Sequence, residues 1–457
     1  MASLKQTLLQ PRKDVDMTEG SIVRHLITFS IPLLLGNIFQ QLYNTVDAWV
    51  VGNFVSDEAF AAVGTVGPII NMLIGFFLGL SSGAGVVISQ YYGAKQYEKV
   101  SSTVHTAITM TIILGMVFTG AGIAMTPTML TLTNTDPEVI PESKAYLIIY
   151  FAGVLGLMIY NIGAGILRAV GDSRRPFYYL VASTLTNIVL DFVFVLGLGM
   201  GVRGVALATV IAQGVSATLT IITLMRSDTC IRLEMGKLKP DFAMLGKIFR
   251  VGLPAALQMT VTSFSNVFVQ SYINGYGKAY MGGWTAYTKL DQVIFLPMQS
   301  ISLAATTFVG QNLGMRNVER AKKGVSQGLA IAMTGTVLIM IPVIAFAPHL
   351  VRFFNDNAEV VEIGTLLLRY ITPFYVLCCI NQIYAGALRG AGNSKVPMII
   401  MLSSFVLFRQ IYLIVMSNFI CSDFLAIAMG YPAGWLVCSA VTLIYYKRVN
   451  LEKSRLV

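Results

Sequence analysis

The residues SQYYGAKQYEKV at 89–100 recur as GQNLGMRNVERA at 310–321, and the glutamine, glycine and glutamate of the two segments are 221 positions apart. A second pair, GAGILRAVGDSRRP at 163–176 and AGALRGAGNSKVP at 385–397, keeps the same separation of 221 through its arginine, glycine, serine and proline. Separate landmarks with one constant separation indicate that the chain contains an internal duplication.

The sequence around these landmarks is apolar. Hydrophobic residues make up 55% of the 457 residues, charged residues only 12%, and the mean hydropathy is +0.70. Soluble domains carry about 25% charged residues, so this composition favours a membrane protein. A helix needs about 20 apolar residues to cross a bilayer. Twelve segments meet that length, at about 26–52, 59–90, 100–126, 141–167, 176–198, 204–226, 247–274, 281–310, 324–347, 359–388, 397–418 and 424–446. We therefore predict an all-α polytopic membrane protein with twelve transmembrane helices.

Basic residues predict the orientation of these helices. Cytoplasmic loops are enriched in Lys and Arg. With twelve spans, 25 of the 32 basic residues fall at the two ends and in alternate connections, and only four fall in the opposite connections. Both termini are therefore expected in the cytoplasm. Six spans per repeat predict two six-helix lobes related by a pseudo-two-fold axis along the membrane normal. We expect an N-lobe at 1–226, a cytoplasmic linker at 227–246 and a C-lobe at 247–457.

The motif content argues against an enzyme. The chain has no GxxxxGK[ST] loop and no HExxH motif, and its five cysteines include no CxxC pair, so we expect free thiols. The net charge of +10 is divided among short clusters between apolar runs, which argues against a nucleic-acid partner. Residues 1–21 lack an apolar core, so we expect the first span to be an uncleaved anchor. Two lobes without an ATP site are typical of a carrier that needs no cofactor and uses an ion gradient.

Polar residues interrupt the apolar segments of the first half at one depth. Asn187 and Asp191 are four residues apart and so share a helix face. Asp47 and Thr209 lie at a similar distance from the outer ends of their spans. A carboxylate in a bilayer costs roughly 3 kcal/mol on insertion scales, and such groups are usually functional. Oxygen ligands suit a small cation or a shared proton. We predict that these four residues bind the coupling ion, as metal ligands if it is Na+.

The first span also carries a polar stripe, formed by Gln40, Asn44 and Asp47, and a proline at Pro32. Proline inside a helix removes one backbone hydrogen bond and permits a bend. We predict a conformational role for Pro32. A bend at this proline would link ion binding at Asp47 to the shape of the central cleft expected between the two six-helix lobes. A static kink would explain the proline equally well.

The second half lacks these acids. Aromatic residues stand 221 positions after Asp47, Asn187 and Asp191, and charged residues occur elsewhere in its spans, at Lys289, Asp291, Arg369 and Arg409. We expect Asp291 to neutralise one of the three bases. Structural ion pairing and substrate contact are equally open roles for this group.

The chain resembles the multidrug and toxic compound extrusion (MATE) family over about residues 22–448. The resemblance rests on IPLLLGNIFQQLYNTVDAWVVG at 31–52, the NxxxD of Asn187 and Asp191, and the paired SQYYGA/GQN and LRAVGDS/LRGAGNS segments. The acids of the first half are similar to those of the prokaryotic branch of the DNA-damage-inducible type.

This resemblance implies two six-helix lobes in a V and the export of amphipathic, often cationic compounds against inward H+ or Na+ by alternating access. It implies an ion site in the N-lobe at the four residues named above, with Asn161 beside it. We also expect Asn44 of the polar stripe to lie beside this site. The resemblance also implies that Pro32 is the bending proline of the family.

The second half departs from part of the family, because the acid that some branches carry in span 7 is missing. The polar groups of that span are Gln258 and Asn266, and we assign them to the substrate cavity together with Asp291 and Arg409.

Two other functions stay open. A flippase for lipid-linked or peptide substrates would line its cavity with bases such as Arg369 and Arg409, and a channel or receptor would act without coupled transport. For the antiporter we expect a monomer in the bacterial cell membrane, with small amphipathic molecules and the lipid bilayer as partners.

Overall fold

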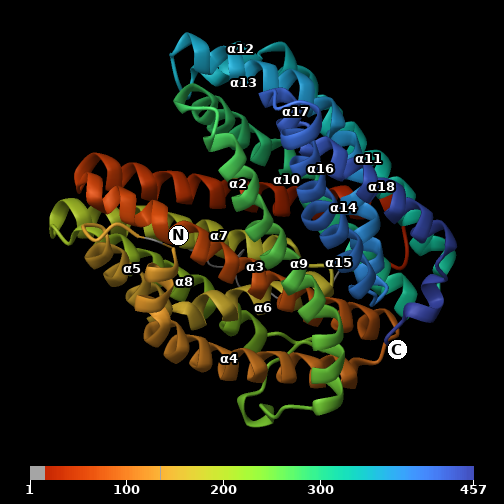
Figure 1. Cartoon of the computed structure of the whole chain (residues 1–457). Helices are drawn as coiled ribbons and strands as arrows, with labels where there is room; N and C mark the ends of the chain where they lie inside the picture. The colour runs from red at the N-terminus through yellow and green to blue at the C-terminus, as the bar shows by residue number, and fades with distance from the viewer. Residues whose placement is uncertain (1–15, 134) are drawn as a thin grey trace. The chain divides into compact units, whose positions relative to one another are not determined.

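The computed structural model describes residues 16–133 and 135–457, and the regular elements within that range are helices (Figure 1). The helices of the first repeat are α2 (Ile22–Phe54), α3 (Asp57–Gly93), α4 (Tyr97–Leu132), α5 (Ile140–Ala152), α6 (Val154–Ala169), α7 (Arg174–Asp191) with the π-helical turn η1 (Phe192–Gly197), and α8 (Gly201–Met225).

The second repeat follows the same order with more interruptions. After the short 3-10 helix η2 (Met235–Lys237) come α9 (Phe242–Asn274), α10 (Lys278–Gly314), α11 (Val318–Ala345), α12 (Ala347–Arg352), α13 (Ala358–Ile371), η3 (Thr372–Phe374), α14 (Tyr375–Gly390), α15 (Lys395–Leu402), η4 (Ser403–Phe408), α16 (Arg409–Val415), η5 (Met416–Ile420), α17 (Phe424–Ala428), α18 (Gly430–Arg448) and η6 (Leu451–Ser454).

The helices have the length and composition of membrane spans. Within the described residues, ten helical segments are long and apolar enough to cross a membrane, and α5 with α6 makes an eleventh that is bent by 48°. The remaining long helix, α9, has 33 residues like α2, but Gln258, Asn266 and several hydroxyl residues lower its hydropathy. Helix α9, which does not meet the hydropathy of a membrane span, thus carries two of the predicted cavity residues.

Equivalent helices of the two repeats agree in length and position. Helices α3 and α10 have 37 residues each, α6 and α14 have 16 each, and both pairs begin 221 positions apart. The turns after α3 and α10 also agree, since Lys95 and Arg316 both adopt left-handed backbone conformations, with φ of 57° and 62°. Non-glycine residues rarely do so. The duplication has therefore been retained down to single backbone angles.

A matching hydrogen bond joins the second and fourth spans of each repeat. Ser81 Oγ donates to the backbone carbonyl of Asn161 at 2.6 Å, and Ser302 Oγ donates to that of Gln382 at 2.6 Å. Helices α3 and α6 pack together in the first repeat, as α10 and α14 do in the second. These pairs form a scaffold common to both repeats.

The chain forms two compact units that do not coincide with the repeats. The first contains Ile31–Leu253, and the second contains Met17–Ser30 together with Pro254–Val457. The first helix of each repeat therefore begins in one unit and continues in the other. Both changes of unit fall within two residues of a proline inside the helix, Pro32 in α2 and Pro254 in α9. Proline weakens the helix at these points.

The start of α2 is held by the second unit. Arg320 Nη2 donates to the backbone carbonyls of Met17, Glu19 and Gly20 at 3.2, 2.8 and 2.9 Å. The backbone amide of Met17 donates to Gln311 Oε1 at 3.0 Å. One arginine thus anchors the chain just before its first helix.

The start of α9 is held by the first unit. The segment 227–246 packs within that unit, where the amide of Glu234 donates to His105 Nε2 at 3.0 Å and that of Asp241 donates to Thr106 Oγ1 at 3.0 Å. Lys247 Nζ donates to the hydroxyl of Tyr91 at 2.6 Å. We call the segments 17–30 and 242–253 the crossing segments, because each precedes the point where its helix changes unit. Both are fixed by hydrogen bonds at or near their starts.

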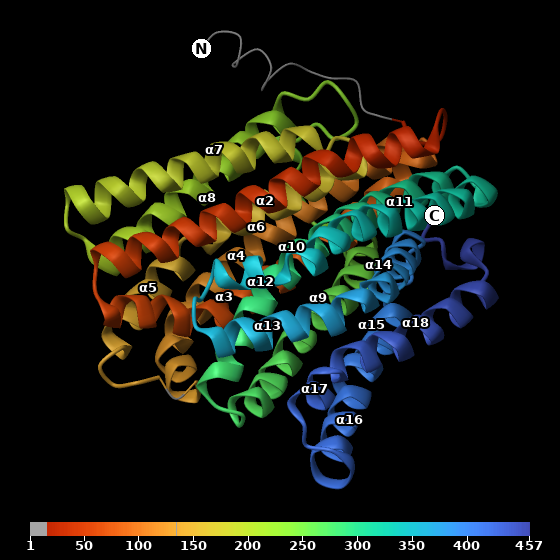
Figure 2. The ribbon, with the colours of Figure 1, turned by 90° about the horizontal axis from the view of Figure 1, so that it is seen from above.

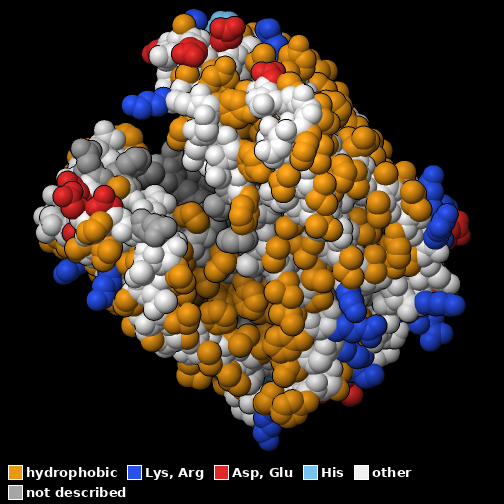
Figure 3. Space-filling model, viewed as in Figure 1, with side chains coloured by type: hydrophobic (Ala, Val, Ile, Leu, Met, Phe, Trp, Pro, Cys, Tyr) orange, Lys and Arg blue, Asp and Glu red, His pale blue; other side chains and the backbone are white. Residues whose placement is uncertain are grey.

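The surface fits a bilayer environment. In the view of Figure 3, hydrophobic side chains cover broad continuous areas, while Lys and Arg side chains gather in a few groups. Large apolar residues such as Met116, Leu338 and Leu407 are more than half exposed. Apolar surface on this scale marks contact with lipid or with other proteins.

Candidate functional site

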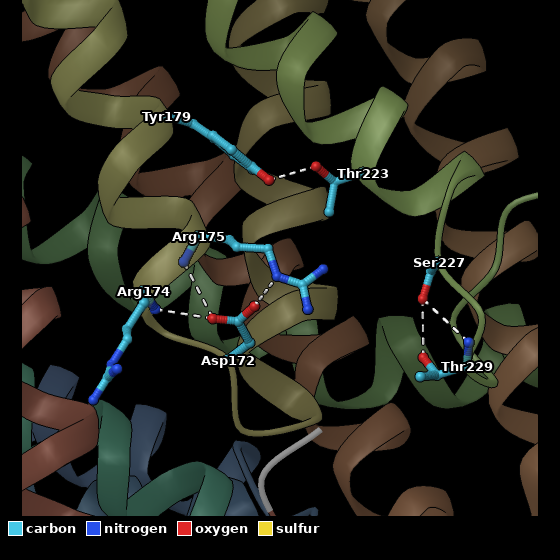
Figure 4. A network of polar contacts seen from close by, with 7 residues as sticks. All are labelled: Asp172, Arg174, Arg175, Tyr179, Thr223, Ser227 and Thr229. Carbon is cyan, nitrogen blue, oxygen red and sulfur yellow. Dashed lines mark hydrogen bonds and ion pairs between the residues drawn. The ribbon is translucent and has the colours of Figure 1, made fainter. Parts of the chain in front are cut away.

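Helix α7, which carries Asn187 and Asp191, is fixed at its start by a turn around Asp172 (Figure 4). Asp172 Oδ1 accepts from the backbone amides of Arg174 and Arg175 at 3.0 and 3.1 Å, and its Oδ2 lies 2.5 Å from Arg175 Nε. The carboxylate caps the first turn, where the amides have no partner in the helix. This capping stabilises the first turn of the helix that carries two of the predicted ion ligands.

Helices α7 and α8 lie side by side in Figures 1 and 2. The hydroxyls of Tyr179 and Thr223 are hydrogen-bonded to each other, and Ser183 Oγ donates to the carbonyl of Ala212 at 2.7 Å. These bonds set the register of the two helices. They bring Asn187 and Asp191 to the same part of the first unit as Thr209 of α8.

Three of the four predicted ion ligands come together directly. Asp47 of α2 interacts at close range with Asp191 and with Asn187 of α7. All three are buried, with exposed fractions of 7% for Asp47 and 0% for the other two. A π-helical turn, η1, begins directly after Asp191. Such turns frequently occur at functional sites because they re-aim the side chains of a helix.

Several polar atoms of this cluster lack a hydrogen-bond partner. Within the described chain, Asp47 Oδ1, both carboxylate oxygens of Asp191 and both amide atoms of Asn187 are buried without a hydrogen bond of standard geometry. Unpartnered buried polar groups are costly, and two adjacent carboxylates cannot both be charged without a cation between them. The geometry can therefore accept a proton or a small cation.

Thr209 joins this cluster through a tyrosine. The hydroxyl of Tyr43 in α2 donates to Thr209 Oγ1 at 3.0 Å, and Tyr43 and Tyr146 of α5 are electrostatic neighbours of Asp47. Sequence reasoning missed both tyrosines. Tyr43 lies four residues before Asp47, so its position on the same helix face was a usable signal.

Two residues expected beside the site make other contacts. Asn161 is buried in α6, but its amide donates to the carbonyl of Leu157 in the same helix at 2.9 Å. Asn44 is exposed, and its amide approaches Gln41 Oε1 at 3.5 Å. Neither bond involves the carboxylates. Pro32 lies inside α2, two positions after that helix changes unit.

Asp291, which the sequence predicted to neutralise a base in the second half, lies next to two tyrosines. Asp291 of α10 accepts a short hydrogen bond from the hydroxyl of Tyr375, and Tyr287 and Tyr375 share a hydrogen bond of 3.0 Å. Among the described residues, no lysine or arginine forms an ion pair with Asp291, since the ion pairs there involve other acids. The expected pairing of Asp291 with Lys289, Arg369 or Arg409 is therefore wrong. Phenol hydroxyls supply the hydrogen bonds that a base would have given.

The other residues predicted to line the substrate cavity differ in solvent exposure. Arg409 is buried at the start of α16 and donates to Asn266 Oδ1 of α9 at 2.9 Å. Gln258 is buried, with its amide 2.7 Å from Met401 Sδ. Asn266 is exposed, and so is Arg369, which was named only for the flippase alternative.

Comparison with known proteins gives consistent matches. A family model described as MatE matches residues 32–193 and 254–431. The chain is 29% identical over 456 residues to the "Probable multidrug resistance protein YoeA" of Bacillus subtilis, with 98% of each chain covered. It is 28% identical over 446 residues to the "Probable multidrug resistance protein NorM" of Thermotoga maritima, with 94% of each covered.

Solved structures agree in fold. The chain matches a multidrug resistance MATE family transporter of the MOP superfamily, described as outward-facing, with a TM-score of 0.90 and 24% identity over 96% of this chain and 98% of that one. A crystal structure of MATE described as bent gives a TM-score of 0.89 at 24% identity, covering 96% and 97%. This likeness confirms the predicted all-α membrane fold of twelve helices in two lobes.

Proposed function

Because the chain belongs to the MatE family, we propose that it is a secondary active antiporter that exports amphipathic, often cationic compounds in exchange for H+ or Na+. The relatives YoeA and NorM carry names of multidrug resistance proteins, which supports small drug-like substrates. We further propose that it is a monomer in a bacterial cell membrane with both termini in the cytoplasm. Its placement in the DNA-damage-inducible branch stays a prediction.

One observation carries the proposed coupling, the buried carboxylate pair of Asp47 and Asp191. These groups lie on different helices and approach each other within the first unit. A bound proton or cation allows α2 and α7 to stay together there, and its loss leaves two negative charges that repel. Ion occupancy therefore controls how tightly α2 holds to α7.

Helix α2 can transmit this change. Its start, Met17–Ser30, belongs to the second unit, and the part with Asp47 belongs to the first. Pro32 lies near the point of change. A bend at this proline alters one end of α2 relative to the other, which is how we propose that ion binding drives alternating access.

Dye efflux from proteoliposomes tests the proposal. Vesicles containing the full chain are loaded with ethidium, and an H+ or a Na+ gradient is imposed alone. At least one of the two gradients is expected to drive dye transport against the dye's own concentration gradient. Protein-free vesicles should show no such transport. Ion flux without dye movement would instead indicate a channel, and translocation of a fluorescent lipid without dye movement would indicate a flippase. Either result would contradict the antiporter.

A further inference from the structure

Arg409 is a buried cation without a buried anion beside it. Its exposed fraction is 3%, and among the described residues no carboxylate lies within ion-pair distance of its guanidinium, because the ion pairs found there use other bases. Asp291, an acid of the same unit, accepts a hydrogen bond from Tyr375, which is hydrogen-bonded in turn to Tyr287. The proposed ion coupling at Asp47 and Asp191 makes no use of this arginine.

The groups around Arg409 are neutral. Its Nη2 donates to Ser265 Oγ and to Asn266 Oδ1, both at 2.9 Å, and its guanidinium lies 4.6 Å from the ring centre of Tyr431. Its Nε is buried and has no hydrogen-bond partner. Neutral acceptors satisfy part of the donor fork, but they leave the charge unbalanced.

A guanidinium in this state favours one type of ligand. Its planar fork matches a carboxylate in a two-point contact, which is stronger than contacts to neutral oxygens. Asn266 is exposed and Tyr431 is partly exposed, so the group is buried next to residues that reach the surface. The hydroxyl of Tyr431 lies 3.4 Å from Asn266 Oδ1, which places these two residues at the edge of the arginine site.

Aromatic rings adjoin the same edge. The ring of Tyr431 packs against Trp284 and Trp435, with ring centres 5.5 and 6.0 Å apart. An anionic group at Arg409 would therefore have apolar and aromatic surface near it. This combination suits an amphipathic molecule with a carboxylate better than a small inorganic anion.

We propose that Arg409, with Asn266 and Tyr431 at its edge, binds the carboxylate of an amphipathic substrate. The protein then takes zwitterionic and anionic amphiphiles as well as cationic ones. This inference rests on the proposed function for its transport meaning, but the binding itself requires neither an ion gradient nor a working Asp47–Asp191 pair.

A matched pair of dyes tests the site. Rhodamine 110 carries a free carboxylate, and rhodamine 123 is its methyl ester, so the two differ only in the group that Arg409 would bind. Affinities are measured by fluorescence anisotropy with the purified full chain in detergent, where transport plays no part. In Arg409→Gln we expect about tenfold weaker binding of rhodamine 110 and an unchanged affinity for rhodamine 123. Arg409→Lys should give an intermediate loss, and Arg203→Gln, an exposed arginine elsewhere, should change neither.

Equal losses for both dyes in Arg409→Gln, or no loss for either, would overturn the proposal. A second measurement uses the wild-type protein in case the variant does not fold. Benzoate should raise its melting temperature and benzamide, the neutral analogue, should not. Identical effects of the two compounds would count against the site, and so would a shift reproduced by sodium chloride at equal concentration, because that would indicate an inorganic anion. Failure of efflux with intact dye discrimination would reject the antiporter and leave this site in place.

Discussion

Both repeats join their first and fifth spans through polar side chains, but the charges are opposite. In the first repeat, Asp47 of α2 meets Asp191 of α7. In the second, Arg409 of α16 donates to Ser265 and Asn266 of α9. Carboxylates lose their charge when they bind a proton, whereas arginine stays charged at any physiological pH. The first repeat therefore holds a contact that can switch, and the second holds one that cannot.

The fifth spans of both repeats depart from regular α-helix next to a charged residue. The π-helical turn η1 directly follows Asp191, and η4 directly precedes Arg409. Both repeats thus interrupt a regular helix next to the charged residue. The pairs α3 with α6 and α10 with α14, in contrast, keep the same serine-to-carbonyl hydrogen bond in both repeats. Duplication preserved the packing, while the polar faces diverged.

The largest expected effect comes from removing the switch. Asp47→Asn keeps the shape of the side chain but removes its charge, so Asp191 no longer needs a shared cation. We expect uphill dye efflux in proteoliposomes to fall to the level of protein-free vesicles, with the protein still folded in the membrane. Efflux under imposed H+ and Na+ gradients measures this.

Asp291→Asn is the matched control, because it removes an acid inside a helix of the second half. We expect ion-dependent efflux to persist, with changes confined to folding or substrate range. Loss of coupling in Asp291→Asn with intact dye binding would place the ion site in the other half.

The two crossing segments, 17–30 and 242–253, should respond differently to the loss of Arg320, because, of these two, this arginine contacts only the first, at its start. Arg320→Ala removes three contacts to the carbonyls of Met17, Glu19 and Gly20, and hydrogen bonds to a charged group contribute about 1.5–3 kcal/mol. Amide exchange in 17–30 should become more than tenfold faster, while exchange in 242–253 stays unchanged. The exposed neighbour Lys322→Ala should leave both segments alone, and equal effects of the two variants would contradict the anchor.

The common scaffold should respond equally in both repeats. Ser81→Ala and Ser302→Ala each remove a hydroxyl bond of 2.6 Å, which should lower the free energy of unfolding by about 1 kcal/mol. Ser302→Ala also removes a longer contact of 3.5 Å from Arg389 Nη2. Melting temperatures in detergent should fall by similar amounts. A large loss in only one variant would show that the repeats do not share this packing.

The smallest expected effect concerns the first turn of α9. The backbone amides of Met244 and Ala243 and the hydroxyl of Ser102 hold the pKa of Asp241 below its usual range, with the Met244 amide contributing most. A lowered folded-state pKa adds stability that is complete above the unfolded value of about 3.9 and is lost as pH falls through the lower folded value. Between pH 5 and 8 Asp241 stays ionised, so its titration should not change how strongly these amides are protected from exchange.

Asp241→Ala provides the comparison for that turn. The loss of a capping carboxylate costs about 1 kcal/mol, so the variant should exchange faster at pH 7 and match the wild type only in strong acid. A wild-type change near pH 6 that the variant lacks would contradict this assignment.

The sequence predicted the spans, the duplication and the approach of Asp47 to Asp191, because hydropathy and helix periodicity are local properties. It did not predict that α2 and α9 change unit at their prolines, since this depends on packing between segments distant in the chain. The tyrosines around Asp291 were missed for the same reason. A search for bases as partners of an acid overlooks hydroxyl donors from a neighbouring helix.

Asp191 gives the most direct test of the central claim, that the carboxylates of the first repeat couple ion binding to substrate binding. Dye affinity is measured from pH 5.5 to 8.5, with and without Na+, for the wild type and for Asp191→Asn. We predict that wild-type affinity changes with pH or with Na+, and that the folded variant binds dye with one affinity throughout. A variant that keeps the full wild-type response would contradict the account.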